Sequence, residues 1–309
     1  MKTTLVTGAA GFAGSHLLDQ LAADEPAGTV VAWHRLARGD GPPGVRWQAV
    51  DMLDRSAVSA AIAETRPAVV FHCAGAAHVQ RASAGAEAAF AINVRGTQFL
   101  LDALAVNNVP CRVLVPSSAM VYQPSARAHT EGDPLVPPNA YGLSKLAQEM
   151  LAARASTNGI SVGIARAFNH VGPRQDPSFV VSDFARQIAR IEAGAAPPEM
   201  VVGNLEAQRE LTDVRDTVRA YRAVVDRGQP GRPYNISSGR AFAIGELLER
   251  LLTRARVPIT VRTDPARFRA NDVTILVGDP SRIREELGWA PQISLDRTLD
   301  DVLEYWRRA

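Results

Sequence analysis

Two side chains that could share a proton, Tyr141 and Lys145, lie four residues apart just after the segment Pro137-Pro138-Asn139. On a helix, this spacing places both side chains on one face. A phenol, with its ordinary pKa of about 10, exchanges protons poorly at neutral pH, but a nearby ammonium group favours the phenolate and lowers that pKa. The pair could therefore move the proton that accompanies a hydride transfer. Such pairs also occur by chance on exposed helices, so the spacing alone leaves both interpretations open.

A third candidate, Ser118, closes an apolar run that reads as a buried strand, residues 113–117. In a doubly wound sheet the carboxyl ends of the strands face the ligand crevice. Ser118 is thus placed to hydrogen-bond a carbonyl or alcohol oxygen of a substrate, or alternatively to cap the turn that follows it. A hydroxyl group at this edge favours the proton-transfer interpretation of Tyr141 and Lys145.

Three glycines, Gly8, Gly11 and Gly14, follow the apolar start of the chain at intervals of three residues, with Phe12 in the same loop. A strand before and a helix after distinguish a dinucleotide-binding turn from an ordinary glycine cluster. Gly8 allows the tight turn, Gly11 lets backbone N–H groups approach a pyrophosphate, and Gly14 lets the helix pack closely on the strand. The motif predicts a nicotinamide dinucleotide site, the alternative being a purely structural strand-to-helix turn.

The choice between NAD and NADP should be made about 20 residues beyond this loop, where an acid holds a ribose hydroxyl or an arginine receives a 2′-phosphate. The second strand ends in Trp33-His34-Arg35 without an acid, and Asp40 lies farther along a loop rich in glycine and proline. Arg35, helped by Arg38, favours NADP(H) over NAD(H), unless Arg35 is only a solvated loop residue. Further residues expected to border the cofactor lie after the next strands: Asp51, Met52, Ala74, Gly75 and Ala76.

These candidates need strands that alternate with helices, and the first half of the sequence supplies them. Strand-like apolar runs are expected at 3–7, 30–33, 46–50, 68–73, 113–117 and 161–165. Apolar residues recur at helical spacing in 16–23, 57–64, 87–106 and 144–155. Continuous apolar strands separated by helices predict a parallel sheet covered on both faces, and right-handed crossovers make it a doubly wound, Rossmann-type α/β sheet.

After residue 165 the pattern changes to loops, with helices expected at 180–193, 214–225, 244–254 and 295–306. Short strands are expected near 234–236 and 259–262. We therefore predict a dinucleotide-binding Rossmann domain over residues 1–165, to which a segment at about 210–240 returns. Residues 166–309 should form mainly a smaller C-terminal α/β lobe that binds the substrate.

Charge and cysteine content exclude several classes of protein. A net charge of +2 over 309 residues is far below the basic excess of a nucleic-acid-binding protein. Two cysteines, Cys73 and Cys111, are too few for a disulfide framework. No apolar run approaches the roughly 18 residues that span a membrane, and the six histidines show no metal-binding spacing. These features predict a cytoplasmic enzyme with no metal, membrane or nucleic-acid partner.

The motifs, in this order, resemble those of the extended short-chain dehydrogenases/reductases that act on nucleotide sugars. The TGxxGFxG loop, the SSxxVY strand end and the YGxSK helix match that family in order and spacing, and the resemblance covers essentially the whole chain. The segments FNHVGP and VGNLEAxR are most similar to GDP-4-dehydro-6-deoxy-D-mannose 4-reductases. The resemblance implies that Ser118, Tyr141 and Lys145 are the catalytic set.

The same resemblance implies contacts with a nucleotide sugar, a GDP-sugar by preference. It places Asn169 at the diphosphate, Arg209 and Arg269 on phosphates, and Asp272 on the nucleotide ribose. Arginine forks suit a doubly charged diphosphate, although any one arginine could instead form a surface ion pair. Around Arg269 the family usually has a following proline, which this sequence lacks.

Relatives of this family form dimers through a four-helix arrangement. The helices expected at 87–106 and 144–155 could form it here, and a homodimer is the expected assembly. Core burial within one subunit explains part of the same apolar pattern. The sequence departs from the family once more at Gln123, which follows Tyr122 where glycine is usual.

The two residues after Ser118, Ala119 and Met120, narrow the reaction. Dehydratases of this family carry acids there, which they need to remove water across C5 and C6 of the sugar. Alanine and methionine transfer no proton, so 4,6-dehydration is disfavoured. What remains is reduction of a 4-keto-6-deoxy sugar at C4 by NADPH, which we favour, or 4-epimerisation on tightly held NAD. A non-catalytic NADP-binding regulator with the same fold is the third interpretation.

Overall fold

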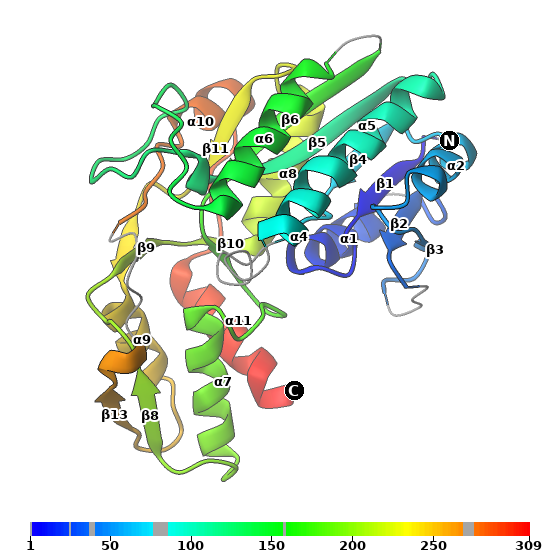
Figure 1. Ribbon diagram of the computed structural model, residues 1–309. Helices are drawn as coiled ribbons and strands as arrows, with labels where there is room; N and C mark the ends of the chain where they lie inside the picture. Colours follow the sequence, from blue (N-terminus) through cyan, green and yellow to red (C-terminus); the bar gives the residue numbers. More distant parts are fainter. Residues whose placement is uncertain (1, 25, 37–40, 77–85, 157–158, 268–274) are drawn as a thin grey trace.

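The structure, a computed structural model, describes residues 2–24, 26–36, 41–76, 86–156, 159–267 and 275–309. Its centre is a seven-stranded sheet in the order β3-β2-β1-β4-β5-β6-β11, in which every pair is parallel (Figure 1). The order reverses direction between β1 and β4, which confirms the predicted Rossmann-type doubly wound sheet. The strands are β1 Thr4–Thr7, β2 Val30–His34, β3 Arg46–Ala49, β4 Val69–His72, β5 Cys111–Ser118, β6 Ile160–Ala167 and β11 Pro233–Ile236.

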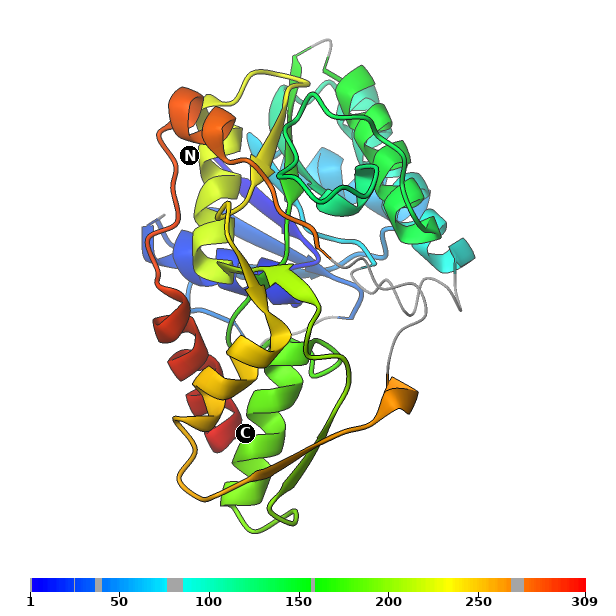
Figure 2. The same ribbon diagram turned by 90° about the vertical axis from the view of Figure 1, so that its left-hand side faces the viewer.

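Helices cover both faces of this sheet because its strands are apolar on both sides. One face carries α2 Arg55–Thr65, α4 Ala86–Phe90, α5 Thr97–Val106 and α6 Ala140–Arg154. The other carries α1 Phe12–Asp24, α8 Val214–Arg227 and α10 Ser281–Leu287. In Figure 2, α6 (green) and α8 (yellow-green) lie on opposite sides of the strands. Each face has its own apolar core, so the sheet is a rigid platform for residues at its carboxyl edge.

The rest of the second half of the chain, apart from β11, α8 and α10, forms a smaller lobe below the carboxyl edge of the sheet (Figure 1). Its core lies among three helices, α7 Val180–Glu192, α9 Ile244–Leu252 and α11 Leu295–Arg308. Three two-stranded sheets complete it: β7 His170–Val171 with β10 Thr212–Asp213, β9 Gln208–Glu210 with β12 Ala241–Ala243, and β8 Glu199–Val202 with β13 Thr260–Thr263. The sequence did not predict β7 to β10 or β12, because strands of two to four residues show little periodicity.

Two helices near the catalytic residues differ from their predicted extent. Helix α6 begins at Ala140 instead of Ser144, because the Asn139 side chain caps it by accepting the Gly142 N–H at 2.9 Å. Tyr141 therefore lies in its first turn. The predicted helix 87–106 is divided by a π-helical turn, Ala91–Gly96, between α4 and α5. Such turns often mark functional sites, and this one faces α6.

Among the described residues, no helix is both long and apolar enough to cross a membrane. That part of the chain also contains no group of three or more His, Cys, Asp or Glu side chains arranged to hold a metal ion.

Candidate active site

Ser118 and Tyr141 meet at the carboxyl edge of the sheet. Ser118 is the last residue of β5, and its Oγ accepts the Met120 N–H at 3.1 Å, which caps a 3₁₀ turn, Ala119–Val121. The same hydroxyl group faces the phenol of Tyr141 on α6 closely enough to lower its pKa. The two roles considered for Ser118 from the sequence, turn cap and partner of the reacting groups, are therefore compatible in one side chain.

A glycine explains how α6 comes so close to the turn after Ser118. A Cβ atom at Gly142 would lie 2.2 Å from the Met120 carbonyl oxygen, so no other residue fits without a backbone shift. This contact lies beside Tyr141 in the first turn of α6, and it sets the distance between the helix and the end of β5.

The electrostatics of Tyr141 differ from the prediction. Burial raises the pKa of Tyr141 above its ordinary value, and the hydrogen bond with Ser118 opposes this only in part. Lys145 was expected to lower that pKa, but the effect of burial is larger; the Lys145 ammonium group donates a hydrogen bond to Gln148 Oε1 at 2.5 Å. Burial also lowers the pKa of Lys145 to about 8, while Cys73 and Glu149 act in the opposite direction.

The glycine loop is as tight as the motif predicts. Gly8 has a φ of +62°, and a Cβ there would lie 2.5 Å from the backbone nitrogen of Ala74. A Cβ at Gly14 would lie 2.4 Å from the Gly8 carbonyl oxygen, so α1 packs directly on the turn. Gly11 donates its N–H to Gly8 at 2.9 Å. Because glycines have no side chains, the backbone N–H groups at this helix N-terminus can approach a pyrophosphate.

The loop also contacts the second half of the chain. The ring of Phe12, the first residue of α1, stacks on His170 with ring centroids 5.6 Å apart. Behind it, His16 Nε2 donates to the Pro173 carbonyl at 2.8 Å, and Arg174 donates to His16 Nδ1 at 2.8 Å. Burial lowers the pKa of His16 to about 4, so this imidazole is neutral and can accept from Arg174.

Near the end of β2, the Ala9 N–H donates to the Trp33 carbonyl at 3.2 Å, which joins the loop to the strand that precedes Arg35. Arg35 is exposed and, within the described residues, makes no hydrogen bond or ion pair. Arg38 and Asp40 lie outside the described residues. After β3, the exposed Asp51 accepts the Leu53 N–H at 2.9 Å.

Met52, expected at the adenine, is buried in the sheet core, with 5% of its surface exposed. The small residues after β4 are held by a residue that the sequence did not single out, Asn93 in the π-helical turn. Asn93 Oδ1 accepts the Ala76 N–H at 2.9 Å, and a Cβ at Gly75 would lie 2.9 Å from the same oxygen. Asn93 Nδ2 donates to Ser144 Oγ on α6 at 2.9 Å. Asn93 therefore joins the loop expected at the cofactor to the catalytic helix.

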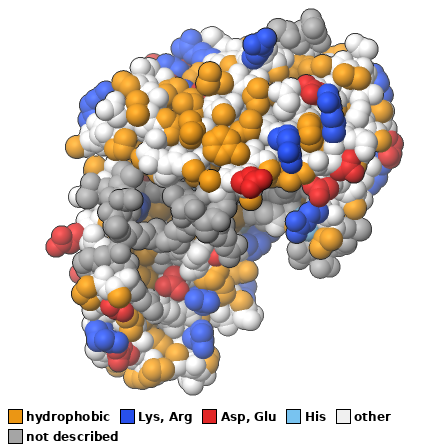
Figure 3. Space-filling model, in the orientation of Figure 1, with side chains coloured by type: hydrophobic (Ala, Val, Ile, Leu, Met, Phe, Trp, Pro, Cys, Tyr) orange, Lys and Arg blue, Asp and Glu red, His pale blue; other side chains and the backbone are white. Residues whose placement is uncertain are grey.

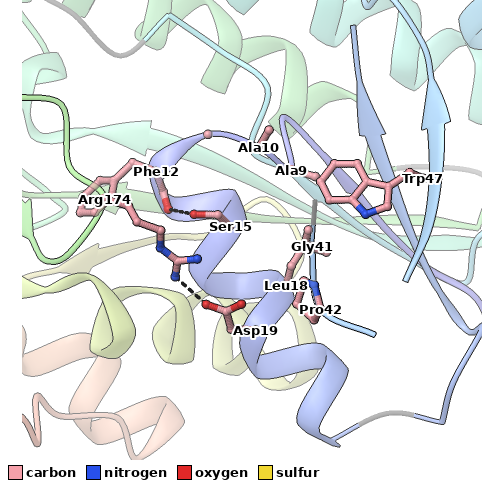
Figure 4. Close-up of a pocket in the computed structure, with 11 residues that line it drawn as sticks. Ala9, Ala10, Phe12, Ser15, Leu18, Asp19, Gly41, Pro42, Trp47 and Arg174 are labelled. Carbon is pink, nitrogen blue, oxygen red and sulfur yellow. Dashed lines mark hydrogen bonds and ion pairs between the residues drawn. The ribbon is translucent and has the colours of Figure 1, made fainter. Parts of the chain in front are cut away.

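A groove of about 420 Å³ runs along the outer side of the glycine loop (Figure 4). The loop residues Ala9, Ala10 and Gly11 help to line it, and the Trp47 indole lies at one end. At the other end lies Arg174, which pairs with Asp19 at 2.5 Å. The sequence did not single out Trp47 or Arg174, because only the fold brings β3 and the turn after β7 to this loop.

The expected substrate residues are only partly described. Asn169, between β6 and β7, is exposed, and its carbonyl accepts the Thr212 N–H at 3.0 Å. Arg209 is half-buried on β9 and donates to the Gln208 carbonyl at 2.7 Å. Arg269 and Asp272 lie outside the described residues.

A buried carboxyl group next to Arg209 organises the loops of the lobe. Glu210 accepts the N–H groups of Ser238, Gly239 and Gly278, and burial raises its pKa to about 7. The sequence offered no signal for this role, since the donors come from loops about 30 and 70 residues away.

Ala119 and Met120, which limit the possible reactions, differ in burial. Ala119 is 2% exposed and belongs to an apolar cluster with Val121, Tyr122 and Phe168. Met120 is half-buried at the edge of that cluster. Neither side chain carries an acidic group.

Comparison with known proteins places this geometry among enzymes of nucleotide-sugar metabolism. The family model described as GDP-mannose 4,6 dehydratase matches residues 5–302. A GDP-6-deoxy-D-mannose reductase of Pseudomonas aeruginosa is 35% identical over 97% of this chain and 96% of its own length. A dTDP-glucose 4,6-dehydratase of Streptomyces griseus is 32% identical over 98% of this chain and 94% of its own length. The solved structure of RMD from Pseudomonas aeruginosa in complex with NADPH has a TM-score of 0.87 at 32% identity and covers 100% of this chain and 99% of that one.

Proposed function

The chain belongs to the nucleotide-sugar epimerase/dehydratase family of extended short-chain dehydrogenases/reductases, and from this premise we propose that it is a 4-reductase. As a member of that family it is an NAD(P)-dependent nucleotide-sugar oxidoreductase. The proposed reaction is the NADPH-dependent reduction of the C4 keto group of a nucleotide-linked 4-keto-6-deoxy sugar. The resemblance to a GDP-6-deoxy-D-mannose reductase supports a GDP-linked substrate.

The observation that carries the proposal is the pairing of Ser118 and Tyr141 at a strand end whose next two residues, Ala119 and Met120, carry no carboxyl group. Ala119 and Met120 supply no acid or base for removing water across C5 and C6. Chemistry at C4 needs only a hydroxyl group that polarises the oxygen and a phenol that transfers one proton.

In the proposed mechanism, bound NADPH supplies a hydride to C4. Tyr141 donates its proton to the developing alkoxide, and Ser118 hydrogen-bonds the same oxygen. The raised pKa of Tyr141 keeps the phenol protonated before the reaction, as an acid requires. Lys145 then offsets the charge of the phenolate until solvent returns a proton to it.

The preference for NADPH rests on the end of β2. Arg35 is exposed two residues after Trp33, whose carbonyl group accepts the N–H of Ala9 in the glycine loop. Trp33, His34 and Arg35 include no acid that could hold an unphosphorylated ribose. For the nucleotide sugar, the proposed contacts remain Asn169, Arg209, Arg269 and Asp272.

The decisive experiment follows NADPH absorbance during incubation with GDP-4-dehydro-6-deoxy-mannose and with its dTDP counterpart. We expect stoichiometric oxidation of NADPH with the GDP-sugar. Tyr141→Phe should bind NADPH normally and lose at least about 100-fold in kcat, because it removes the proton donor and little volume. Near-normal turnover by Tyr141→Phe would show that this phenol is not the acid.

The same assay separates two other functions. A 4-epimerase is compatible with Ala119 and Met120, but it would retain its cofactor through purification and consume none. A non-catalytic NADP-binding regulator would bind NADPH and oxidise none with any nucleotide sugar. The reductase alone consumes one NADPH for each sugar that it reduces.

We further propose that the protein is a homodimer that works in the cytoplasm. Apolar side chains gather on the face formed by α5 and α6 (Figure 3). Leu143 and Met150 on α6 are 50% and 66% exposed, and Val106 at the end of α5 is 73% exposed. An apolar face of this kind is what a two-fold helical interface buries. Sedimentation of the wild type against Met150→Glu tests it, since a charge there should shift the equilibrium toward monomer.

A further inference from the structure

A buried glutamine on the catalytic helix holds the ammonium group of Lys145. Lys145 Nζ donates to Gln148 Oε1 at 2.5 Å, and Gln148 Nε2 donates to Thr97 Oγ1 on α5 at 2.8 Å. Gln148 is 0% exposed and Lys145 is 7% exposed, so neither bond competes with bulk water. Tyr141, Lys145 and Gln148 are spaced i, i+4 and i+7, which places them along one face of α6.

The hydrogen bonds around Thr97 fix which way the Gln148 amide points. The Thr97 hydroxyl gives its single hydrogen to the Asn93 carbonyl at 2.6 Å, so its oxygen can only accept from other neighbours. It therefore needs the NH₂ group of Gln148, which leaves the amide oxygen facing Lys145. A reversed amide would set NH₂ against the ammonium group and leave buried polar atoms unpaired.

The same chain of hydrogen bonds continues to the glycine loop. His72 Nε2 lies 2.9 Å from Thr97 Oγ1 and must donate to it, so Nδ1 accepts the Thr7 hydroxyl hydrogen at 2.8 Å. Thr7 Oγ1 in turn accepts the Ala74 N–H at 3.2 Å. Thr7 precedes Gly8, and Ala74 is the residue against which Gly8 packs. The position of the ammonium group is thus linked to the loop that fits a pyrophosphate.

The titratable groups that face Lys145 supply no competing partner. Burial and the Lys145 charge lower the pKa of His72 to about 3, so its ring stays neutral. Burial raises the pKa of Cys73 to about 12, so its thiol stays protonated. Glu149, one turn further along α6, acts on Lys145 through its charge, while its oxygens accept hydrogen bonds from Ser117 and Arg166. Within the described residues, Lys145 has no carboxylate partner, and Gln148 accepts its hydrogen bond.

From this arrangement we propose that Gln148 is a positioning residue, which fixes the Lys145 ammonium group for the reaction; the role in turnover rests on the proposed function. One ammonium hydrogen goes to Gln148, and two remain for the groups that react or bind beside it. Because Thr97 holds the amide, the position of Lys145 is set by α5 and β4 as well as by its own helix. Partners of this kind, one contact away from a functional group, orient it.

The sequence allows a direct measurement, because Lys145 and Lys2 are its two lysines. Protein labelled with ¹³C at lysine Cε gives two side-chain signals, and the exposed Lys2 serves as the internal reference. In Gln148→Leu the pKa of Lys145 should fall below about 8, because burial is then less opposed. In Gln148→Glu a carboxylate should raise it. Shifts in opposite directions support the proposal, and unchanged titration in both folded variants overturns it.

Kinetics test the role in turnover. Gln148→Leu should lower kcat by about 10–100-fold with little change in the KM for the nucleotide sugar, and Gln148→Glu should recover part of the loss. Thr97→Val keeps Gln148 but removes its anchor, and should act in the same direction to a smaller extent. Gln187→Leu removes a comparable side chain that bonds Asp183 on α7, and should change neither the Lys145 titration nor kcat.

The Lys145 titration and the turnover kinetics test different statements, so one can be contradicted without the other. If the wild-type enzyme reduces no 4-keto nucleotide sugar, the proposed function is wrong, while the lysine titration still decides whether Gln148 controls Lys145. If the wild type is active and Gln148→Leu keeps its kcat despite a shifted titration, Gln148 binds Lys145 without positioning it for turnover, and the proposal is wrong.

Discussion

The Rossmann body and the C-terminal lobe hold their site residues in different ways. In the body, backbone contacts leave no space, since added Cβ atoms at Gly8 and Gly142 would lie 2.5 Å and 2.2 Å from backbone atoms. In the lobe, one carboxyl group, Glu210, gathers backbone N–H groups from two loops. A site fixed by shape suits proton and hydride transfer, which depend on position within fractions of an ångström. Loops gathered by one side chain can change between relatives, as substrate recognition requires.

The largest effect should come from adding volume in the body. In Gly142→Ala the new methyl group meets the Met120 carbonyl oxygen and pushes α6 away from Ser118. We expect kcat to fall by at least about 100-fold and the free energy of unfolding by about 1–3 kcal/mol. Gly132→Ala is the control, because its nearest heavy atom would be 3.9 Å away. Equal kinetics in both variants would contradict the idea that this contact sets the catalytic geometry.

A smaller effect, of a different kind, should follow from removing the acceptor in the lobe. Glu210→Ala leaves the Ser238, Gly239 and Gly278 N–H groups without their partner. We expect the KM for the nucleotide sugar to rise about 10-fold while kcat changes little, with a loss of about 1–3 kcal/mol in the free energy of unfolding. Steady-state kinetics and urea denaturation measure the two effects. A large fall in kcat with unchanged KM would contradict the idea that the lobe controls substrate binding and the body controls turnover.

Arg35 lies on an exposed part of the body, so replacing it tests a cofactor contact that does not depend on close packing. Arg35→Ser should weaken NADPH binding by about 5–10-fold and leave NADH binding unchanged, because an exposed phosphate contact is partly screened by water. Fluorescence titration with both cofactors measures this. Arg46→Ser, which removes an exposed arginine paired with Glu64 at 3.1 Å, is the matched control. Equal losses for NADPH and NADH would show that Arg35 does not select the 2′-phosphate.

The smallest effect should be a pH dependence of the KM for the nucleotide sugar, caused by Glu210 in the lobe. Glu210 has its pKa raised to about 7, so its carboxylate form prevails above that pH and accepts a proton as the pH falls through it. Protonation places a hydrogen on an oxygen that faces N–H donors, and the KM for the nucleotide sugar should rise about twofold below pH 7. In Glu210→Gln the KM should no longer vary with pH in this range. A pH effect on KM that persists in this variant must come from another group.

Much of the fold could be predicted because the main sheet is built from long, regular signals. The runs that became β4 and β5 are mostly apolar strands of four and eight residues, and each is followed by a helix with regular spacing. The lobe was harder to predict, because β7 and β10 have two residues each and exist only through their mutual pairing. The helix expected directly after Asn139 is α6, although regular helical spacing was evident only from residue 144.

The candidate catalytic residues were predicted from their positions, but their interactions were not. Ser118 and Tyr141 follow a strand end and a helix start, so topology alone brings them together. The direction of the Lys145 side chain depends on Gln148 and on Thr97, which lies 48 residues earlier on another helix. Asn93 and Glu210 were missed for the same reason, since their partners are backbone groups that only the folded chain brings near. The pKa of Tyr141 was predicted to be lowered by Lys145 but is raised, because spacing along a helix does not reveal how deeply the phenol is buried.

The stack of Phe12 on His170 also bears on protein engineering. The turn around residues 169–174 follows the last long strand of the body, so exchanging substrate lobes between relatives would place a crossover near residue 166. That crossover would separate His170 and Arg174 from Phe12, His16 and Asp19, to which they bind. A chimera joined after Gln175 keeps these contacts within one parent. Modules of this enzyme should therefore be exchanged at that later junction.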